Sequence, residues 1–273
     1  MCDEISCGTH DTRPPVPVPD EKRRLFVKGL ASLPLAAVLA NPELTRAAAH
    51  KLMPATIKNE RGEARGYLAV PDKTPAPAVL LIHEWWGLND QIKAVANDMA
   101  RAGFLAFAID MFNGSVATTR EQAMAQIRGL DVEAGTRAVA AAVEWLRNHE
   151  KGNGKVGTVG WCFGGGWSLN ASLAAPVDAT VIYYGNVKKS AKELASLQGP
   201  VLGHFGTLDK RINAEMVGDF ERAMMEAGKT DLTIHWYTAD HAFANPSGAR
   251  YDKDDANLAW TRTLAFLHKH LGE

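Results

Sequence analysis

From about residue 50 onward, short hydrophobic runs alternate with longer amphipathic segments. The run AVLLIH at 78–83 is hydrophobic without interruption, which is typical of a strand covered on both faces of a sheet. The segment 89–103 has helical spacing instead, with Asn89 or Asp90 as N-cap and Gly103 at its end. This alternation predicts a mostly parallel sheet with helices on both faces. We expect further strands at 66–70, 104–109, 155–160, 179–184, 200–206 and 232–237, and further helices at 119–149, 165–175, 190–197, 213–228 and 254–271.

Length and composition suit one globular domain, which we assign to residues 50–273. The chain has 273 residues, of which 46% are hydrophobic and 22% are charged. Its net charge is −1, and Lys and Arg are spread along the chain. A nucleic-acid-binding surface needs a concentrated basic patch, so this class of function is excluded.

The first 49 residues have a different character and predict an unstructured leader or export signal. A polar, Pro-rich stretch leads to RRLFVK at 23–28, followed by an apolar run at 29–40. That run is too short to span a membrane as a helix, and candidate cleavage points follow Ala40 and Ala49. The pattern resembles a twin-arginine export signal, which implies the export machinery as a partner and a periplasmic location. The alternative is a basic tail retained on a cytoplasmic protein.

The segment GWCFG at 160–164 places a cysteine between a predicted strand and a predicted helix. This matches the G-x-nucleophile-x-G turn of α/β-hydrolases, in which the glycines let the backbones approach closely. The helix N-terminus favours a thiolate at Cys162, and the backbone N–H of Phe163 is a candidate oxyanion donor. Since Cys2 and Cys7 lie in the leader, Cys162 is the single cysteine of the domain. The alternative is an inert buried thiol.

A cysteine nucleophile requires a base and an acid, and both are expected later in the chain. Asp209 follows the predicted strand 200–206, and His241 follows the last predicted strand. Both lie at carboxyl ends of strands, where open α/β sheets place their sites. Asp240 competes for the role of acid, but an adjacent residue seldom has the geometry to orient the ring. His204 is expected to be a core histidine, and the other histidines of the domain are less favoured as the base: His83, His235, His268 and His270.

The loop HEWWGL at 83–88 follows a predicted strand and is expected to face the cysteine turn. In α/β-hydrolases this loop supplies the second oxyanion donor, which makes the backbone N–H of Trp85 the candidate. Glu84 would then place a carboxylate near the thiol. Taken alone, an acidic residue in such a loop is as readily a surface group.

Together the segments GWCFGGG, HEWWGL, GTLDKRI and DHAFAN resemble the dienelactone hydrolase family over about residues 55–271. The resemblance implies an α/β-hydrolase fold and opening of lactones or esters through a thioester. It implies Cys162 as the nucleophile, with Asp209 and His241 as its partners. It also implies that Glu84 is the glutamate that contacts the cysteine, holds the thiol quiescent and then helps to deprotonate it.

Two arginines that bind the substrate carboxylate in this family are missing from the matching positions. The segment DMFNGSVATT has none before Arg120, and Asn245 stands where the second is expected. Ala242 likewise replaces a serine that is common in the family, and Arg250 is a candidate to reach the site instead. We expect a more apolar substrate pocket, formed by site-loop residues: Trp85, Trp86, Phe112, Trp161, Phe243 and Asn245.

The sequence therefore favours a hydrolase of a small ester or lactone, with no metal or organic cofactor expected, since no HExxH or paired-cysteine motif occurs. A broad carboxylesterase for neutral esters is the first alternative, and the missing arginines favour it. A non-hydrolytic thiol redox or binding protein is the second. It has no resolving cysteine in the domain and leaves Asp209 and His241 without a role.

Overall fold

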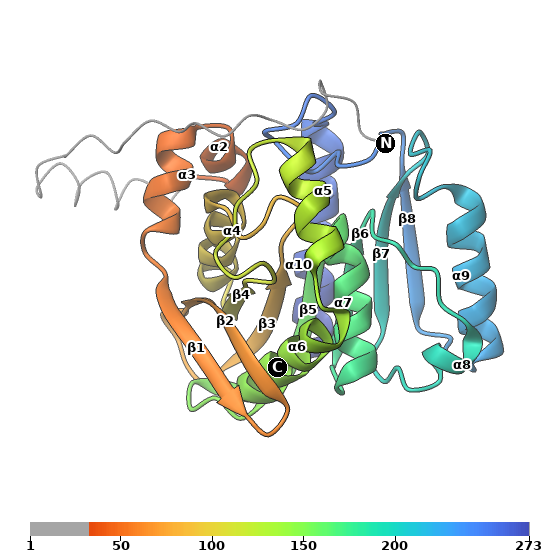
Figure 1. Cartoon of the computed structure of the whole chain (residues 1–273), viewed down its shortest axis with the longest axis horizontal. Helices are drawn as coiled ribbons and strands as arrows, with labels where there is room; N and C mark the ends of the chain where they lie inside the picture. The colour runs from red at the N-terminus through yellow and green to blue at the C-terminus, as the bar shows by residue number, and fades with distance from the viewer. Residues whose placement is uncertain (1–32, 273) are drawn as a thin grey trace, which may run out of the picture.

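An eight-stranded sheet runs through the computed structural model, which describes residues 33–272 of the chain (Figure 1). The strand order is β1-β2-β4-β3-β5-β6-β7-β8. All pairings from β4 to β8 are parallel, whereas β1–β2 and β2–β4 are antiparallel. The predicted mostly parallel sheet is therefore confirmed. The strands are β1 (Met53–Asn59), β2 (Gly62–Ala69), β3 (Ala76–Ile82), β4 (Leu105–Ile109), β5 (Gly152–Trp161), β6 (Ala179–Tyr183), β7 (Val201–Gly206) and β8 (Leu232–Tyr237).

Helices cover both faces of the sheet, as the uninterrupted hydrophobic strands require. Val79 and Leu81 of β3 pack with α4 and α10, whereas Leu80 and Ile82 of the same strand face α6 and α7. The helix α9 packs on the same face as α7, over β6 and β7. The covering helices are α4 (Asp90–Arg101), α6 (Val132–Arg147), α7 (Phe163–Ala174), α9 (Ala214–Glu226) and α10 (Lys253–Leu271), with the short α8 (Ala191–Leu194) beside α9.

The long helix expected at 119–149 is wrong, because the chain breaks there into α5 (Arg120–Gly129) and α6. Leu130 adopts an extended backbone, and Asp131 caps α6 by accepting hydrogen bonds from the backbone N–H groups of Glu133 and Ala134. An aspartate at this position satisfies N–H groups that a continuous helix would pair internally. The break frees α5 to lie over the HEWWGL loop, where Gln126 Nε2 donates to the carbonyl of Trp85 at 3.0 Å.

The strand β1 was not expected from the sequence. It is an edge strand that pairs with β2 alone, and of its side chains only Ile57 is buried. A mostly exposed edge strand carries too little hydrophobic periodicity to be recognised.

Part of the expected leader is folded. Residues 35–49 form α2 (Leu35–Leu39) and α3 (Pro42–Ala49), whose Val38 and Ala48 pack on Ala94 of α4. The segment 23–28 lies outside the described residues, and the boundary at residue 49 stays a prediction. Within the part of the chain that the structure describes, no helix is both long and apolar enough to cross a membrane.

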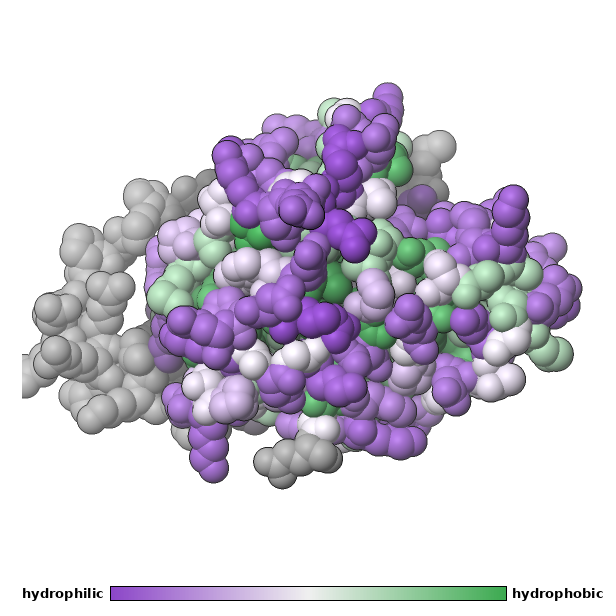
Figure 2. Space-filling model, turned by 90° about the horizontal axis from the view of Figure 1, so that it is seen from below, coloured by the Kyte–Doolittle hydropathy of each residue, from purple (hydrophilic) through white to green (hydrophobic). Residues whose placement is uncertain are grey.

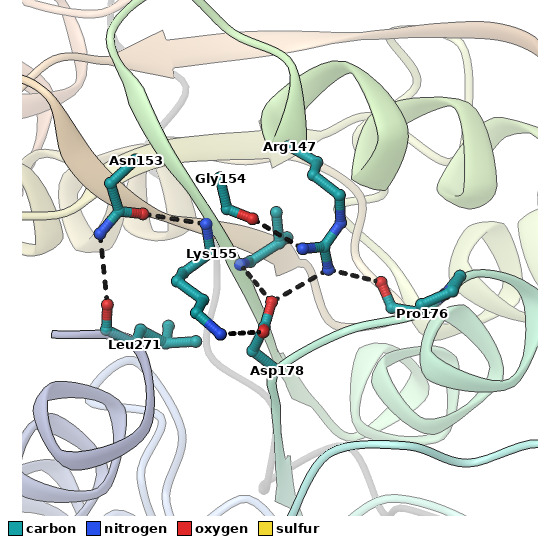
Figure 3. A network of polar contacts seen from close by, with 8 residues as sticks. Arg147, Asn153, Gly154, Lys155, Pro176, Asp178 and Leu271 are labelled. Atoms are coloured by element: carbon teal, nitrogen blue, oxygen red, sulfur yellow. Dashed lines mark hydrogen bonds and ion pairs between the residues drawn. The ribbon is translucent and has the colours of Figure 1, made fainter.

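A polar network ties the elements together where β5 and β6 begin (Figure 3). Asp178 accepts hydrogen bonds from Arg147 at 2.9 Å, Lys155 at 2.9 Å and the backbone N–H of Val156 at 3.0 Å. Asn153 contacts the carbonyl of Leu271 at the end of α10. The molecule seen from below is mostly hydrophilic, with hydrophobic residues in small separate areas (Figure 2). The contacts of Asp178 and Asn153 stabilise the start of β5. Cys162 directly follows the other end of that strand.

Candidate active site

Cys162 lies on a strained turn between β5 and α7. Its φ is 54°, in the left-handed region that residues with a side chain seldom adopt. A Cβ added to Gly160 would lie 1.9 Å from the carbonyl oxygen of Gly164, and one added to Gly164 would lie 2.1 Å from that of Ile82. Both glycines are therefore required for α7 to start directly after the strand, and the predicted turn geometry is present.

The loops after β7 and β8 bring an acid and a base to this cysteine. His241 Nε2 lies 3.1 Å from Cys162 Sγ, and His241 Nδ1 lies 2.6 Å from Asp209 Oδ2. Asp209 is held in turn, because its Oδ1 accepts the backbone N–H groups of Arg211 and Ile212 at 2.8 and 3.0 Å. The competing Asp240 accepts the backbone N–H of His241 and does not hydrogen-bond to the ring. The structure thus joins the three residues that the sequence predicted in the predicted order.

The surroundings of His241 favour its protonated form. Burial alone lowers the pKa of His241, but the negative charges of the Cys162 thiolate and of Asp209 outweigh it and raise the pKa to about 11. Burial raises the pKa of Asp209, yet the hydrogen bond and charge of His241 leave it lower than usual. Asp209 therefore stays ionised and holds Nδ1–H, which leaves Nε2 of the protonated ring facing the Cys162 sulfur.

Two backbone N–H groups beside the sulfur are the candidate oxyanion donors. Phe163 is the first residue of α7, and the first N–H groups of a helix have no acceptor within it. Within residues 33–272, neither the N–H of Phe163 nor that of Trp85 has a hydrogen-bond acceptor. Both groups are thus unoccupied donors on loops that the sequence assigned to this task.

His83 fixes the loop that carries Trp85. Its Nε2 accepts the backbone N–H of Met111 at 3.1 Å, and its Nδ1 donates to the carbonyl of Glu84 at 2.6 Å. Complete burial is the main reason that its pKa falls to about 4, so the ring is neutral at physiological pH. A neutral ring can accept at one nitrogen and donate at the other, which this double contact requires.

Glu84 is buried beside the trio rather than exposed on its loop. Its side chain is 6% exposed, Asn245 Nδ2 donates to its Oε2 at 2.5 Å, and the hydroxyl of Tyr184 donates to its Oε1 at 3.3 Å. Sequence reasoning missed Tyr184 as a site residue because it reads as the last residue of a buried strand. The ring of Tyr184 packs edge-on against His241 at 5.2 Å, and its φ of 36° is again in the left-handed region.

A cavity of about 320 Å³ opens at Cys162 and His241. One part of its lining is apolar and includes the side chains of Trp85 and Phe163. Another part is basic, and the described residues that line the cavity include no carboxylate. The remaining lining residues are Met124, Ile127, Gly166, Trp167, Asn170, Tyr184, Asn186, Lys188, Lys189, Arg211 and Ile212.

The other residues expected in the substrate pocket do not line this cavity. They pack instead against neighbouring aromatic rings or, for Asn245, against Glu84, and Arg250 contacts Asp240 at 3.4 Å. Asn245 is 4% exposed, so it is buried in the protein interior beside Glu84. The ring contacts are Trp86 on Trp85, Phe112 on His83 and Phe163, Trp161 on Tyr183, and Phe243 on Tyr184 and Tyr237.

The sheet is mostly parallel, Cys162 lies on a strained turn after β5, and the loops after β7 and β8 bring Asp209 and His241 to it. This arrangement is that of an α/β-hydrolase. Residues 64–271 match the dienelactone hydrolase family, and the chain belongs to that family. It is therefore a hydrolase that acts on esters or lactones.

Individual relatives cover most of the chain. Carboxymethylenebutenolidase 1 of Cupriavidus pinatubonensis is 29% identical over 76% of this chain and 92% of its own length. Carboxymethylenebutenolidase of Pseudomonas putida is 31% identical over 72% of this chain and 87% of its own. Among solved structures, a dienelactone hydrolase-like promiscuous phosphotriesterase from metagenomic libraries is similar in fold, with a TM-score of 0.72 and 24% identity over 81% of this chain and 99% of that one. A putative dienelactone hydrolase of Klebsiella pneumoniae has a TM-score of 0.70 and 23% identity over 80% and 98%.

Proposed function

We propose that the protein hydrolyses a small ester or lactone through a thioester on Cys162. The observation that carries this proposal is the unbroken chain of contacts from Cys162 Sγ to His241 Nε2 and from His241 Nδ1 to Asp209. It gives the sulfur a base within hydrogen-bond reach and gives that base an orienting carboxylate.

In the first half-reaction the Cys162 thiolate attacks the carbonyl carbon of the substrate. The carbonyl oxygen becomes an oxyanion that the N–H groups of Trp85 and Phe163 stabilise. The bond between the carbonyl carbon and the alcohol oxygen then breaks, and the His241 imidazolium donates its Nε2 proton to the departing alkoxide. In a lactone, this alcohol remains attached to the acyl group.

In the second half-reaction a water molecule attacks the thioester. His241, now neutral, accepts a proton from that water, and the carbon–sulfur bond breaks to release the acid and restore the thiolate. Asp209 keeps Nδ1 protonated throughout, so Nε2 alone exchanges protons.

The cavity lining supports an apolar substrate that also bears a negative charge. Lys189 is paired with Glu193 at 3.2 Å, whereas Lys188 and Arg211 form no ion pair with any residue that the structure describes. A carboxylate on the substrate would supply the missing partner for either cation. The second candidate is a neutral ester, which the apolar side chains of the cavity favour.

Turnover of matched acidic and neutral esters tests these proposals. We expect Cys162-dependent hydrolysis, which Cys162→Ala abolishes while the circular dichroism spectrum is retained. A preference for the acidic ester that disappears in Lys188→Ala/Arg211→Ala identifies the charged substrate class. Equal or better turnover of the neutral ester, with no effect of that double variant, identifies the second candidate. Undiminished hydrolysis by Cys162→Ala would refute the thioester mechanism.

We also propose that the protein is exported by the twin-arginine machinery. The support is the sequence RRLFVK at 23–28 and the short apolar run that follows it. Cell fractionation of wild type and Arg23→Lys/Arg24→Lys tests the proposal. We expect hydrolase activity in the periplasm for wild type and its loss from the periplasm for the double variant. Activity that stays in the cytoplasm for both proteins contradicts the proposal of export.

A further inference from the structure

Two neutral side chains hold the buried carboxylate of Glu84, one on each oxygen. Asn245 Nδ2 lies 2.5 Å from Oε2, and the Tyr184 hydroxyl lies 3.3 Å from Oε1. Asn245 is 4% exposed and Tyr184 is 1% exposed, so bulk water does not compete for these contacts. Asn245 lies 161 positions along the chain from Glu84, which makes this pairing a product of the tertiary fold.

The direction of the amide contact is fixed by Ser247. The backbone N–H of Ser247 donates to Asn245 Oδ1 at 3.0 Å, and its hydroxyl donates to the same oxygen at 2.7 Å. A backbone N–H can only donate, so the atom that faces it is the amide oxygen. The amide nitrogen is therefore turned toward Glu84, and the contact is a hydrogen bond from a neutral donor to a carboxylate.

We infer that Asn245 is a positioning residue that holds Glu84 as an ionised carboxylate beside the reacting pair, with Ser247 fixing the orientation of the amide. The inference rests on the proposed thioester mechanism. A hydrogen bond to the charged form favours ionisation of a buried carboxyl, and an amide donor provides it without adding a positive charge. Tyr184 connects Glu84 to the reacting pair, because its hydroxyl contacts Glu84 Oε1 at 3.3 Å and its ring packs against His241 at 5.2 Å.

Several other titratable groups lie around Glu84 in the described part of the chain, and all of them are the same in wild type and in the variants below. His83 precedes it and has a pKa of about 4 because of burial. Burial raises the pKa of Tyr184, and burial likewise raises that of Tyr251, which lines a small cavity with Glu84. Cys162 and His241 belong to the reacting pair and are unchanged in the variants below.

The test compares the pH dependence of kcat for wild type, Asn245→Leu and Asn245→Asp in the full chain. In Asn245→Leu the carboxylate loses the donor on its Oε2, so we expect the acid limb of kcat to move to higher pH by about one unit or more. In Asn245→Asp two carboxyls share one proton at low pH, and the protonated Asp side chain replaces the amide donor. At higher pH both are charged, so we expect this variant to lose activity on the alkaline side instead.

Several outcomes separate positioning from packing. Two results together support the inference. KM of both Asn245 variants stays within about twofold of wild type, and the acid limb of kcat moves to higher pH in Asn245→Leu whereas the alkaline limb moves to lower pH in Asn245→Asp. A Ser247→Ala variant retains the backbone donor and should shift the acid limb less than Asn245→Leu does. Asn153→Asp, the same change at the far end of β5, should leave the profile unaltered. Loss of kcat by one pH-independent factor in both Asn245 variants overturns the inference. If hydrolysis does not depend on Cys162, the proposed function fails first, and the Cys162→Ala control reveals that separately.

Discussion

Two buried histidines, His204 in β7 and His241 in the loop after β8, have pKa values that are shifted in opposite directions. His241 contacts Asp209 and the Cys162 sulfur, and these negative partners overcome burial and raise its pKa to about 11. His204 contacts the hydroxyls of Tyr237 at 2.8 Å and Thr263 at 3.1 Å. Burial, aided by the positive charges of His235 and Arg262, lowers its pKa well below the usual value.

The difference teaches that burial and hydrogen bonding do not identify a reactive histidine. Both rings are almost completely buried, and each ring makes a polar contact through each of its two nitrogen atoms. His204 lies in a buried hydroxyl network, since Thr263 also contacts the hydroxyl of Tyr183 at 2.6 Å. His241 has one ionised partner and one reactive partner that opens onto the cavity. Ionisable partners and access, rather than burial, mark the functional ring, and the expectation of a core role for His204 is confirmed.

The largest effect is expected when each ring is replaced by the same amide. His241→Gln should lower kcat/KM for an ester by about 10³- to 10⁴-fold, because base and acid are lost together. His204→Gln should leave kcat/KM within about threefold and lower the free energy of unfolding by about 1–3 kcal/mol, because buried hydroxyls lose a partner. Steady-state kinetics and urea unfolding of both variants decide this. A large kinetic loss in His204→Gln would break the comparison.

Asp209→Asn sharpens the comparison, because it removes the carboxylate charge that His241 has beside it and His204 lacks. We expect kcat to fall by about 10³-fold, because an amide allows the wrong tautomer of His241 and no longer stabilises the imidazolium. The pKa of His241, followed by NMR, should decrease. The matched control is Tyr237→Phe, which removes a neutral partner of His204 and should leave kcat unchanged. An unaltered kcat in Asp209→Asn contradicts the assignment of the acid.

The two histidines should also give stability opposite dependences on pH. His204 is neutral when folded, but the unfolded chain protonates it below about pH 6.5, so it reduces stability as pH falls. His241 has a raised folded pKa, so its contribution is complete below about pH 6.5 and is lost as pH rises toward 11. Each slope is at most about 1.4 kcal/mol per pH unit.

Urea unfolding of wild type and of the two glutamine variants at several pH values measures these slopes. His204→Gln should flatten the decline on the acid side, although His83, whose pKa is about 4, retains a slope of the same sign. His241→Gln should flatten the decline on the alkaline side. If His204→Gln instead flattens the alkaline decline and His241→Gln the acid decline, the charge states of the two histidines are assigned wrongly.

The smallest effect is expected at the edge of the His204 network. Thr263→Val keeps the shape of a fully buried side chain but removes the hydroxyl that contacts both Tyr183 and His204. We expect a loss of about 1–2 kcal/mol in the free energy of unfolding and no change in kcat. Thermal unfolding with a parallel activity assay measures both quantities, and a change in kcat beyond about twofold would link this network to the site.

Local patterns explain which parts of the fold were predictable. The parallel strands were found because their hydrophobic runs are uninterrupted, and the cysteine turn was found because two glycines flank it at fixed spacing. The break between α5 and α6 was missed although Asp131 is a recognisable cap, since the segments on both sides of it are rich in helix-forming residues. The strand β1 was missed because an edge strand buries almost nothing.

The sequence alone determined the α/β sheet, the position of Cys162 on a strained turn and the chain order of Cys162, Asp209 and His241. Each of these depends on residues that are neighbours in the chain or on strand ends that must meet at one edge. Only the tertiary structure decided that Asn245 and Tyr184 hold Glu84, and that Lys188 and Arg211 line the cavity whereas Trp86, Phe112, Trp161 and Phe243 do not. Such contacts join distant segments whose side-chain directions are set by packing, and no periodicity or spacing in the sequence records them.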